Sequence, residues 1–276
     1  MNLVRSEFLK ISTTNTWWIF ALIYLPLWAL TLLVNYLQTS VLADSSRLGE
    51  VSPADAEVFD VISEPPALAA NLYTNGQFFG LLIVMLLGTI VVTNEYFHQT
   101  ATTTFLTTPQ RTAVILAKLA AAMLLGALFW LVTTGFNLIG GSLIMVSLDL
   151  GAQLGTGTVW EAVGLNGLAY LLWAIFGVGF GVLIRSQLGA TVSAILLYLG
   201  GYLGAAIILN ILAARFGDWI SDLQVIVPSL ASQLLVAGTD DLPGSPPRWT
   251  GAVVLIGYAL VTGIVGTIIT RRRDIS

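Results

Sequence analysis

Long apolar runs separated by short polar connections dominate the chain. Six windows contain no Asp, Glu, Lys or Arg, and each exceeds the about 20 residues that a helix needs to cross the hydrocarbon core of a bilayer. Because a charge at the bilayer centre costs about 2.5 to 3.5 kcal/mol, such windows mark membrane spans. They are residues 11–43, 65–94, 119–148, 162–184, 186–214 and 249–270. The pattern predicts an all-α polytopic membrane protein with six transmembrane helices.

We place these helices at residues 17–37, 75–93, 113–146, 162–184, 187–212 and 250–270, within a single transmembrane domain over residues 1–276. The third window contains four glycines, but its about 30 residues cannot hold two crossings of about 20 residues each and a turn. We therefore predict one long or tilted helix. Lys118, in its first turn, is expected to extend its ammonium toward the membrane interface.

Composition leads to the same fold class. The chain is 56% hydrophobic and only 9% charged, whereas about a quarter of the residues are charged in ordinary soluble domains. The excess apolar surface is expected to face lipid. The first apolar run is far longer than the about 7 to 15 apolar residues of a signal peptide, so we expect it to remain in the mature chain. The chain has no cysteine, so no disulfide can order its external loops.

The distribution of Lys and Arg predicts the orientation. With both termini in the cytoplasm, eight of the 11 basic residues lie inside and three lie outside, as the positive-inside rule requires. Twelve of the 15 acidic residues then lie outside. The acidic pI of about 4.8 therefore reflects the external face, and we expect no nucleic-acid partner. The predicted location is a bacterial plasma membrane, crossed several times.

The predicted cytoplasmic connection between the second and third spans, residues 94–111, is polar but carries few charges. As a helix it would hold Glu95 in its first turn, where a carboxylate is favourable, and Pro109 near its end. The many threonines between them are mediocre helix formers, so a stable helix here would need partner contacts. Its aromatic residues suit a docking element. The alternative is a plain connection whose aromatic residues anchor at the lipid head groups.

Three other segments complete the predicted layout. Residues 1–16 have apolar residues near one helical face and are expected to form an interfacial elbow helix, or else the frayed start of the first span. Residues 38–74 are expected to form an external, partly ordered acidic lid. In the external residues 213–249, an apolar stretch at 223–237 is too short to cross. It is expected to be a re-entrant helix pair before the last span, or a surface amphipathic helix.

Several kinds of chemistry are excluded by the residues present. The sequence Gly-x-x-x-x-Gly-Lys-Ser/Thr does not occur, so the chain is not expected to bind ATP or to be an enzyme by itself. With one histidine and no cysteine, no metal site is expected. The windows lack Asp and Glu, which argues against a proton-driven carrier. Uncharged polar residues that would line a path, or else join helices, are Asn137, Thr133, Thr134, Asn166, Tyr198 and Tyr202.

The segment Glu95-Tyr96-x-His98-x-Thr100, with Leu106-x-Thr108-Pro109-x-Arg111 further on, resembles the Glu-Tyr-Arg-His-Gly-Thr…Leu-x-Thr-Pro-x-Arg segment of type-2 ATP-binding-cassette (ABC) transporter permeases, in the form common in actinobacteria. The six-span layout, the short N-terminal segment and the Arg-Arg-Arg-Asp tail resemble that family as well. Phe97, Gln99 and Gln110 depart from the usual Arg, Gly and Arg, which lowers the positive charge of this segment.

The resemblance implies that residues 94–111 form a coupling helix that docks into a separate cytoplasmic ABC ATPase. Its coupling residues would be Glu95, Tyr96, Phe97, His98, Thr100, Phe105, Leu106, Pro109 and Arg111. The implied complex contains two ATPase copies, which bind ATP and Mg, and a second permease, either the same chain or a relative. The implied function is ATP-driven export of an amphipathic drug, lipid or peptide. The alternatives are an ATP-independent channel or structural subunit, and a regulatory or immunity permease with little transport.

Overall fold

Six candidate membrane spans are present in the computed structural model, which describes residues 2–44, 53–100, 106, 110–184, 186–237 and 245–272. Within these ranges every regular element is a helix. The spans are Thr16–Leu42, Pro65–Phe97, Arg111–Ser147, Gly157–Leu183, Gln187–Phe216 and Arg248–Ile269. The predicted all-α fold with six apolar helices long enough to cross a bilayer is therefore confirmed.

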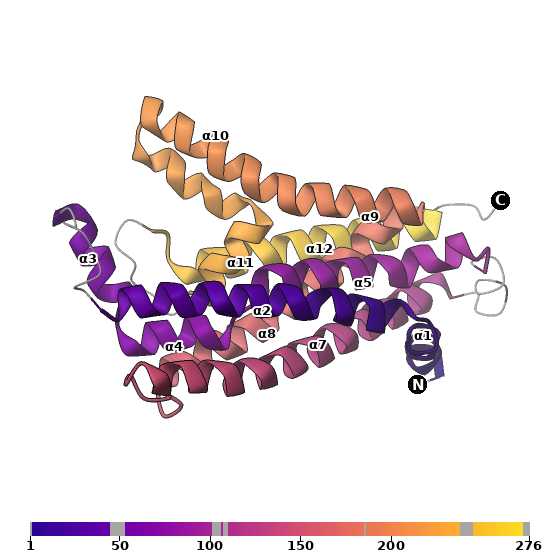
Figure 1. The fold of residues 1–276 in the computed structure, drawn as a ribbon. Coiled ribbons are helices and arrows are strands. Elements are labelled where there is room, and N and C mark those ends of the chain that lie inside the picture. Colours follow the sequence, from indigo (N-terminus) through magenta and orange to yellow (C-terminus); the bar gives the residue numbers. More distant parts are fainter. Residues whose placement is uncertain are drawn as a thin grey trace.

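The long helices lie alongside one another in a single elongated bundle (Figure 1). In chain order they are α1 (Asn2–Ser12), α2 (Thr16–Leu42), α3 (Pro53–Ile62), α4 (Pro65–Tyr73), α5 (Gln77–Phe97), α7 (Arg111–Ser147), α8 (Gly157–Leu183), α9 (Gln187–Ile195), η2 (Leu196–Gly200), α10 (Gly201–Phe216), η3 (Asp218–Ile226), α11 (Pro228–Val236) and α12 (Arg248–Arg272). The helix α1 and the C-terminal end of α12 lie at the same end of the bundle, and α3 lies at the other end.

The centre of the bundle is α8, which packs against α4, α5, α7, α11 and α12. Its side chains Tyr170 and Trp173 are fully buried. The indole nitrogen of Trp173 donates a hydrogen bond to Ser232 Oγ on α11 at 2.7 Å. Small residues on α8 let the neighbouring helices approach closely. In lipid the hydrophobic effect does not drive helices together, so close van der Waals packing of this kind contributes much of their association.

The closest of these approaches joins α5 and α8 through glycines. A Cβ on Gly88 would lie 2.6 Å from the carbonyl oxygen of Ala174, and a Cβ on Gly177 would collide with the carbonyl of Met85. Across the same contact, Thr89 Oγ1 donates a hydrogen bond to the carbonyl oxygen of Gly177 at 3.1 Å. The backbones of these two spans therefore touch without intervening side chains.

We expect Gly177→Ala to lower the free energy of unfolding by about 1–3 kcal/mol, because the added methyl group meets backbone atoms that cannot move aside. Gly135→Ala on α7 is the matched control, since no atom lies within 4 Å of its Cβ position. The control should be neutral or slightly stabilising, as alanine favours a helix. Thermal unfolding of the purified variants in detergent measures both effects. Equal midpoints for the two variants would contradict the close approach.

The second span is broken between α4 and α5. Gly76 has φ of 72°, a left-handed conformation that glycine adopts without strain, and its carbonyl accepts a hydrogen bond from the hydroxyl of Tyr24. The carboxamide of Asn137 on α7 donates to the carbonyl oxygens of Tyr73 at 3.1 Å and Asn75 at 2.9 Å. These bonds satisfy backbone groups that a continuous helix would have paired internally.

Much of residues 38–74, which we expected to form an external, partly ordered acidic lid, is helical. The helix α2 continues to Leu42, and α4 packs against α7 and α8 with Leu68, Leu72 and Tyr73 almost completely buried. The apolar composition of residues 65–73 drives this burial, since the exposed alternative would leave those side chains in water. Residues 45–52 lie outside the described residues.

The fifth span is bent away from the bundle. The helix α10 leans outward together with η3, whereas α9 packs on α5 (Figure 1). The π-helical turn η2 lies between α9 and α10 and turns Tyr198 inward, where its hydroxyl donates to the carbonyl of Phe78 at 2.6 Å and its ring contacts Trp173. Most of α2 and α10 is exposed, so apolar faces on these helices remain available to lipid or to another subunit.

The predicted helix pair before the last span is present. Residues Trp219–Ile226 and Pro228–Val236 form two short helical segments that meet at 98°. The second segment, α11, packs against α8 and α12 and buries Ala231 and Leu235, so it is not a surface helix. Residues 238–244, which follow it, lie outside the described residues.

Candidate functional site

A cluster of four charged side chains joins α1, α5 and α7 at the end of the bundle where α1 lies. Lys118 on α7 places its ammonium 2.7 Å from a carboxylate oxygen of Glu7 and 2.9 Å from one of Glu95. Lys10 lies 2.7 Å from each of the same two carboxylates. Each glutamate is thus shared by two lysines, and the cluster has no net charge.

The cluster is buried. Lys118 is 2% exposed, Glu7 is 4% exposed and Glu95 is 5% exposed. Moving single charges out of water costs several kcal/mol per ion, which is tolerable only where opposite charges and hydrogen bonds compensate. Here the Lys118 ammonium also donates to the carbonyl oxygen of Val91 at 3.3 Å. The cluster therefore requires all four charges together.

Lys10 lies at the outer edge of the cluster. Burial alone would lower the pKa of its ammonium, but the ion pairs with Glu7 and Glu95 outweigh this and raise the pKa above its usual value. Lys10 consequently remains charged throughout the physiological pH range.

The expectation that Lys118 reaches toward the membrane interface is wrong. Its side chain turns inward, because two carboxylates from other helices lie within ion-pairing distance. The partner Glu7 lies 111 residues away in the chain, so no local pattern in the sequence reveals the pair.

The predicted coupling segment begins differently from the sequence-based expectation. Glu95, Tyr96 and Phe97 form the last turn of α5, and not the first turn of a new helix. His98 caps α5, and the amide of Thr100 donates to the carbonyl of Glu95 at 2.9 Å. A carboxylate near a helix C-terminus is unfavourable for the helix dipole, so the lysines of the cluster offset that cost at Glu95.

The remaining predicted coupling residues lie beyond this turn. Leu106 is 78% exposed, and Arg111 begins α7. Phe105 and Pro109 lie outside the described residues.

A surface groove of about 510 Å³ lies between the end of α5 and the start of α9. Phe97, 66% exposed, and Leu188, 75% exposed, are large apolar side chains in its lining. The groove residues are Tyr96, Phe97, Ser186, Gln187, Leu188 and Thr191. No sequence pattern indicated the contribution of α9, because residues 185–187 were predicted only as a short connection between two spans. Of the predicted coupling residues, Tyr96 and Phe97 therefore line this groove.

Two of the predicted path residues connect helices. Asn137 bonds to the α4–α5 break and accepts a hydrogen bond from the indole nitrogen of Trp28 at 2.6 Å, so its carboxamide is fully engaged. Tyr198 is bound to Phe78. These side chains join neighbouring helices by hydrogen bonds. Joining helices was the alternative that we gave to a role in a path.

The other predicted path residues do not gather around one space. Thr133 lines a largely apolar cavity of about 370 Å³ beside α2 and α7. Thr134 Oγ1 and Asn166 Oδ1 are buried and find no hydrogen-bond partner among the described residues. Tyr202 is partly exposed and its ring lies 4.9 Å from that of Phe78. These described side chains therefore lie in different surroundings within the bundle.

Comparison with models of known protein families and with curated proteins gives no match for this chain.

Proposed function

We propose that this chain is the membrane-spanning permease subunit of an ATP-driven ABC exporter, operated by a separate cytoplasmic ATPase. The observation that carries the proposal is the pairing of an exposed groove with a buried charge cluster at one helix end. Phe97 lines the groove, and Glu95, two residues earlier, belongs to the cluster.

This arrangement suits the transmission of force. A partner seated on Phe97 and Leu188 would push on the last turn of α5 and the first turn of α9. Through Glu95 the same turn is tied to α1 and α7. Binding energy that differs between two partner conformations would then bias the positions of several spans together, as coupling requires.

The exposed apolar faces of α2 and α10 support a complex with a second permease, which is either the same chain or a relative. With two ATPase copies on the cytoplasmic side, the path would lie between the two permeases. In such a complex the predicted path residues need not line one cavity within a single chain. The cargo that we propose is amphipathic, in keeping with the uncharged polar and aromatic residues of the spans.

Co-expression with ATP-binding-cassette ATPases of the same cell, followed by purification through a tag on this chain, tests the proposal. We expect one ATPase to copurify in equal amounts, and membrane vesicles containing both to accumulate an amphipathic dye only with ATP. Transport by the purified chain alone, without an ATPase, would contradict the proposal.

The proposed orientation predicts opposite labelling of the two ends of the bundle. The chain lacks cysteine, so Asp60→Cys on α3 and Leu188→Cys on α9 each introduce a single thiol at an exposed position. In intact cells a membrane-impermeant maleimide should label the Asp60→Cys variant. The Leu188→Cys variant should be labelled only after permeabilisation. The reverse result would overturn the orientation.

A further inference from the structure

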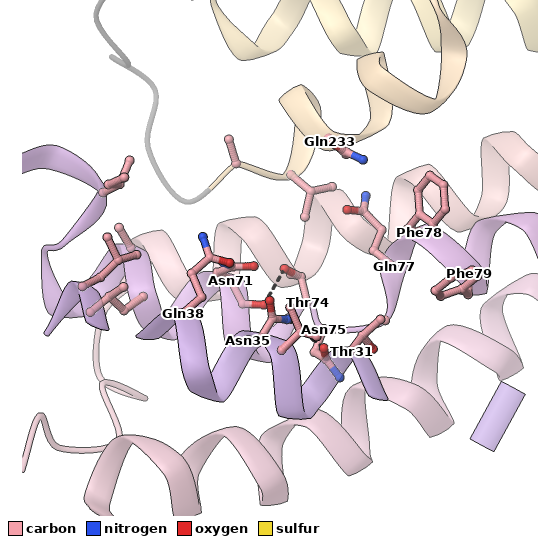
Figure 2. Close-up of a pocket in the computed structure, with 18 of the residues that line it drawn as sticks. Thr31, Asn35, Gln38, Asn71, Thr74, Asn75, Gln77, Phe78, Phe79 and Gln233 are labelled. Atoms are coloured by element: carbon pink, nitrogen blue, oxygen red, sulfur yellow. Dashed lines mark hydrogen bonds between the residues drawn. The ribbon is translucent and has the colours of Figure 1, made fainter. Parts of the chain in front are cut away.

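A cavity of about 580 Å³ lies at the end of the bundle opposite the charge cluster. It is lined by α2, the end of α3, α4, the start of α5 and α11, and it is open on one side (Figure 2). Its volume falls within the range of about 300–1,000 Å³ that is typical of small-molecule sites. The cavity shares no lining residue with the groove at Phe97.

The polar part of the lining consists of carboxamides and hydroxyls. Figure 2 shows these side chains, contributed by α2, α4, α5 and α11, around the same space. The carboxamides belong to Asn35, Gln38, Asn71, Asn75, Gln77 and Gln233. No Asp, Glu, Lys or Arg is among the lining residues in the described part of the chain, although exposed acidic residues such as Asp60 and Glu64 occur nearby on the same end.

Three of the carboxamides are held in place by the fold. Asn35 donates to Asn75 at 2.7 Å, Asn75 donates to the carbonyl oxygen of Trp28 at 3.3 Å, and Gln77 donates to the carbonyl oxygen of Ser232 at 3.0 Å. These bonds link α2, the α4–α5 break and α11. They preorganise one side of the cavity before any ligand enters.

The other three carboxamides have free hydrogen-bonding capacity. Gln38, Asn71 and Gln233 are exposed, and their side chains make no hydrogen bond to the described residues. A carboxamide offers both N–H donors and a carbonyl acceptor, so it matches groups that donate and accept in turn. Hydroxyl groups both donate and accept hydrogen bonds, so they match these carboxamides.

The remaining lining is apolar. Leu30 and Val34 on α2, Phe78 and Phe79 on α5, and Val236 on α11 face the same space. A ligand that satisfies both kinds of lining has a hydroxylated head and an apolar chain. A charged head would lose its hydration without meeting an opposite charge, which costs far more than transferring a neutral hydroxyl.

We propose that this cavity binds an uncharged amphiphile with a hydroxylated head group, of the glycerol or sugar type. The head would bond to Gln38, Asn71 and Gln233, and the chain would lie along α2 and the two phenylalanines. The proposal concerns binding by this chain alone, and it stands whether or not an ATPase docks at Phe97.

Photo-crosslinking of the purified chain in lipid nanodiscs tests the proposal. The probe is a monoacylglycerol with a diazirine in its acyl chain, and mass spectrometry locates the attachment. We expect saturable labelling of peptides from α2, α4 and α11, prevented by unlabelled monoacylglycerol. A lysophosphatidate with the same acyl chain should compete at least about tenfold more weakly, because its phosphate finds no cation among the described lining residues. Unsaturable labelling or equal competition would overturn the proposal.

A double variant separates specific binding from partition into lipid. Asn71→Leu with Gln233→Leu removes two free carboxamides and should weaken competition by monoacylglycerol about tenfold or more. Asn210→Leu is the matched control, because Asn210 is an exposed carboxamide on α10 outside the cavity. Both proteins should unfold at the same temperature, since the replaced side chains are exposed. Unchanged labelling of the double variant would count against the assigned residues and hence against the site.

Discussion

Lys118→Met is expected to lower the free energy of unfolding by about 3–5 kcal/mol, because it leaves a buried cluster with one cation for two carboxylates. Methionine has nearly the length of lysine, so the loss would come from charge and hydrogen bonding more than from a cavity. The remaining cation, Lys10, is partly exposed and is already paired with both carboxylates. We also expect poor yield of the variant in membranes.

Thermal unfolding in detergent, followed by size-exclusion chromatography, measures the effect. Lys118→Arg keeps the charge and should lose far less stability than Lys118→Met. Combining Lys118→Met with Glu7→Gln restores neutrality and should recover much of the stability, which a defect of packing alone would not allow. If Lys118→Met unfolds within a degree or two of the natural chain, the ammonium is not buried between the two carboxylates.

Phe97→Asp is expected to reduce ATP-driven transport and copurification of the ATPase at least about tenfold while the chain stays folded. Large aromatic side chains at the centre of interfaces contribute about 2 kcal/mol or more to binding, and an aspartate there would add an unpaired charge. Phe97 is exposed in the isolated chain, so its replacement should leave the unfolding temperature unchanged. Replacement of Glu95 should instead lower the unfolding temperature, since it would break the buried cluster.

Two further variants make this test specific. Leu188→Asp changes the other wall of the groove and should have a similar effect. Leu154→Asp introduces the same charge at an exposed leucine in the connection from α7 to α8 and should leave copurification intact. Normal coupling in both groove variants would contradict docking at this groove, whatever partner the chain has.

The six spans were predictable because they depend on composition alone. Each charge-free window is long enough to be helical in lipid, and the structure places a helix or helix pair in every one. The break at Gly76 was not predictable in this way. Residues 65–75 carry no charge, and the break depends on bonds from Tyr24 and Asn137, which are distant in sequence.

The candidate site was predictable only in part. The polar segment 94–111 and its exposed aromatic residue Phe97 stand out in the sequence, and Leu106 is exposed as a docking residue would be. The local pattern nevertheless put Glu95 in a first helical turn and Lys118 at the interface. Both assignments failed because each side chain finds its partners on helices that only the fold brings together.

The carboxamide cavity could not be read from the sequence for the same reason. Its free carboxamides come from α2, α4 and α11, and Gln233 lies more than one hundred residues beyond Asn71. Single Asn and Gln residues at such spacing carry no periodic signal. Only their convergence distinguishes them from ordinary polar side chains at helix ends.

The position of Glu95 and Lys118 on consecutive spans bears on how the nascent chain enters the membrane. The two residues flank one short connection, so the hairpin of α5 and α7 can leave the translocon with its opposite charges already joined. Glu7 and Lys10 are synthesised earlier and would already lie at the bilayer surface when that hairpin inserts. The central helix α8 emerges only afterwards, so the interior can close around a pair of charges that is already neutral.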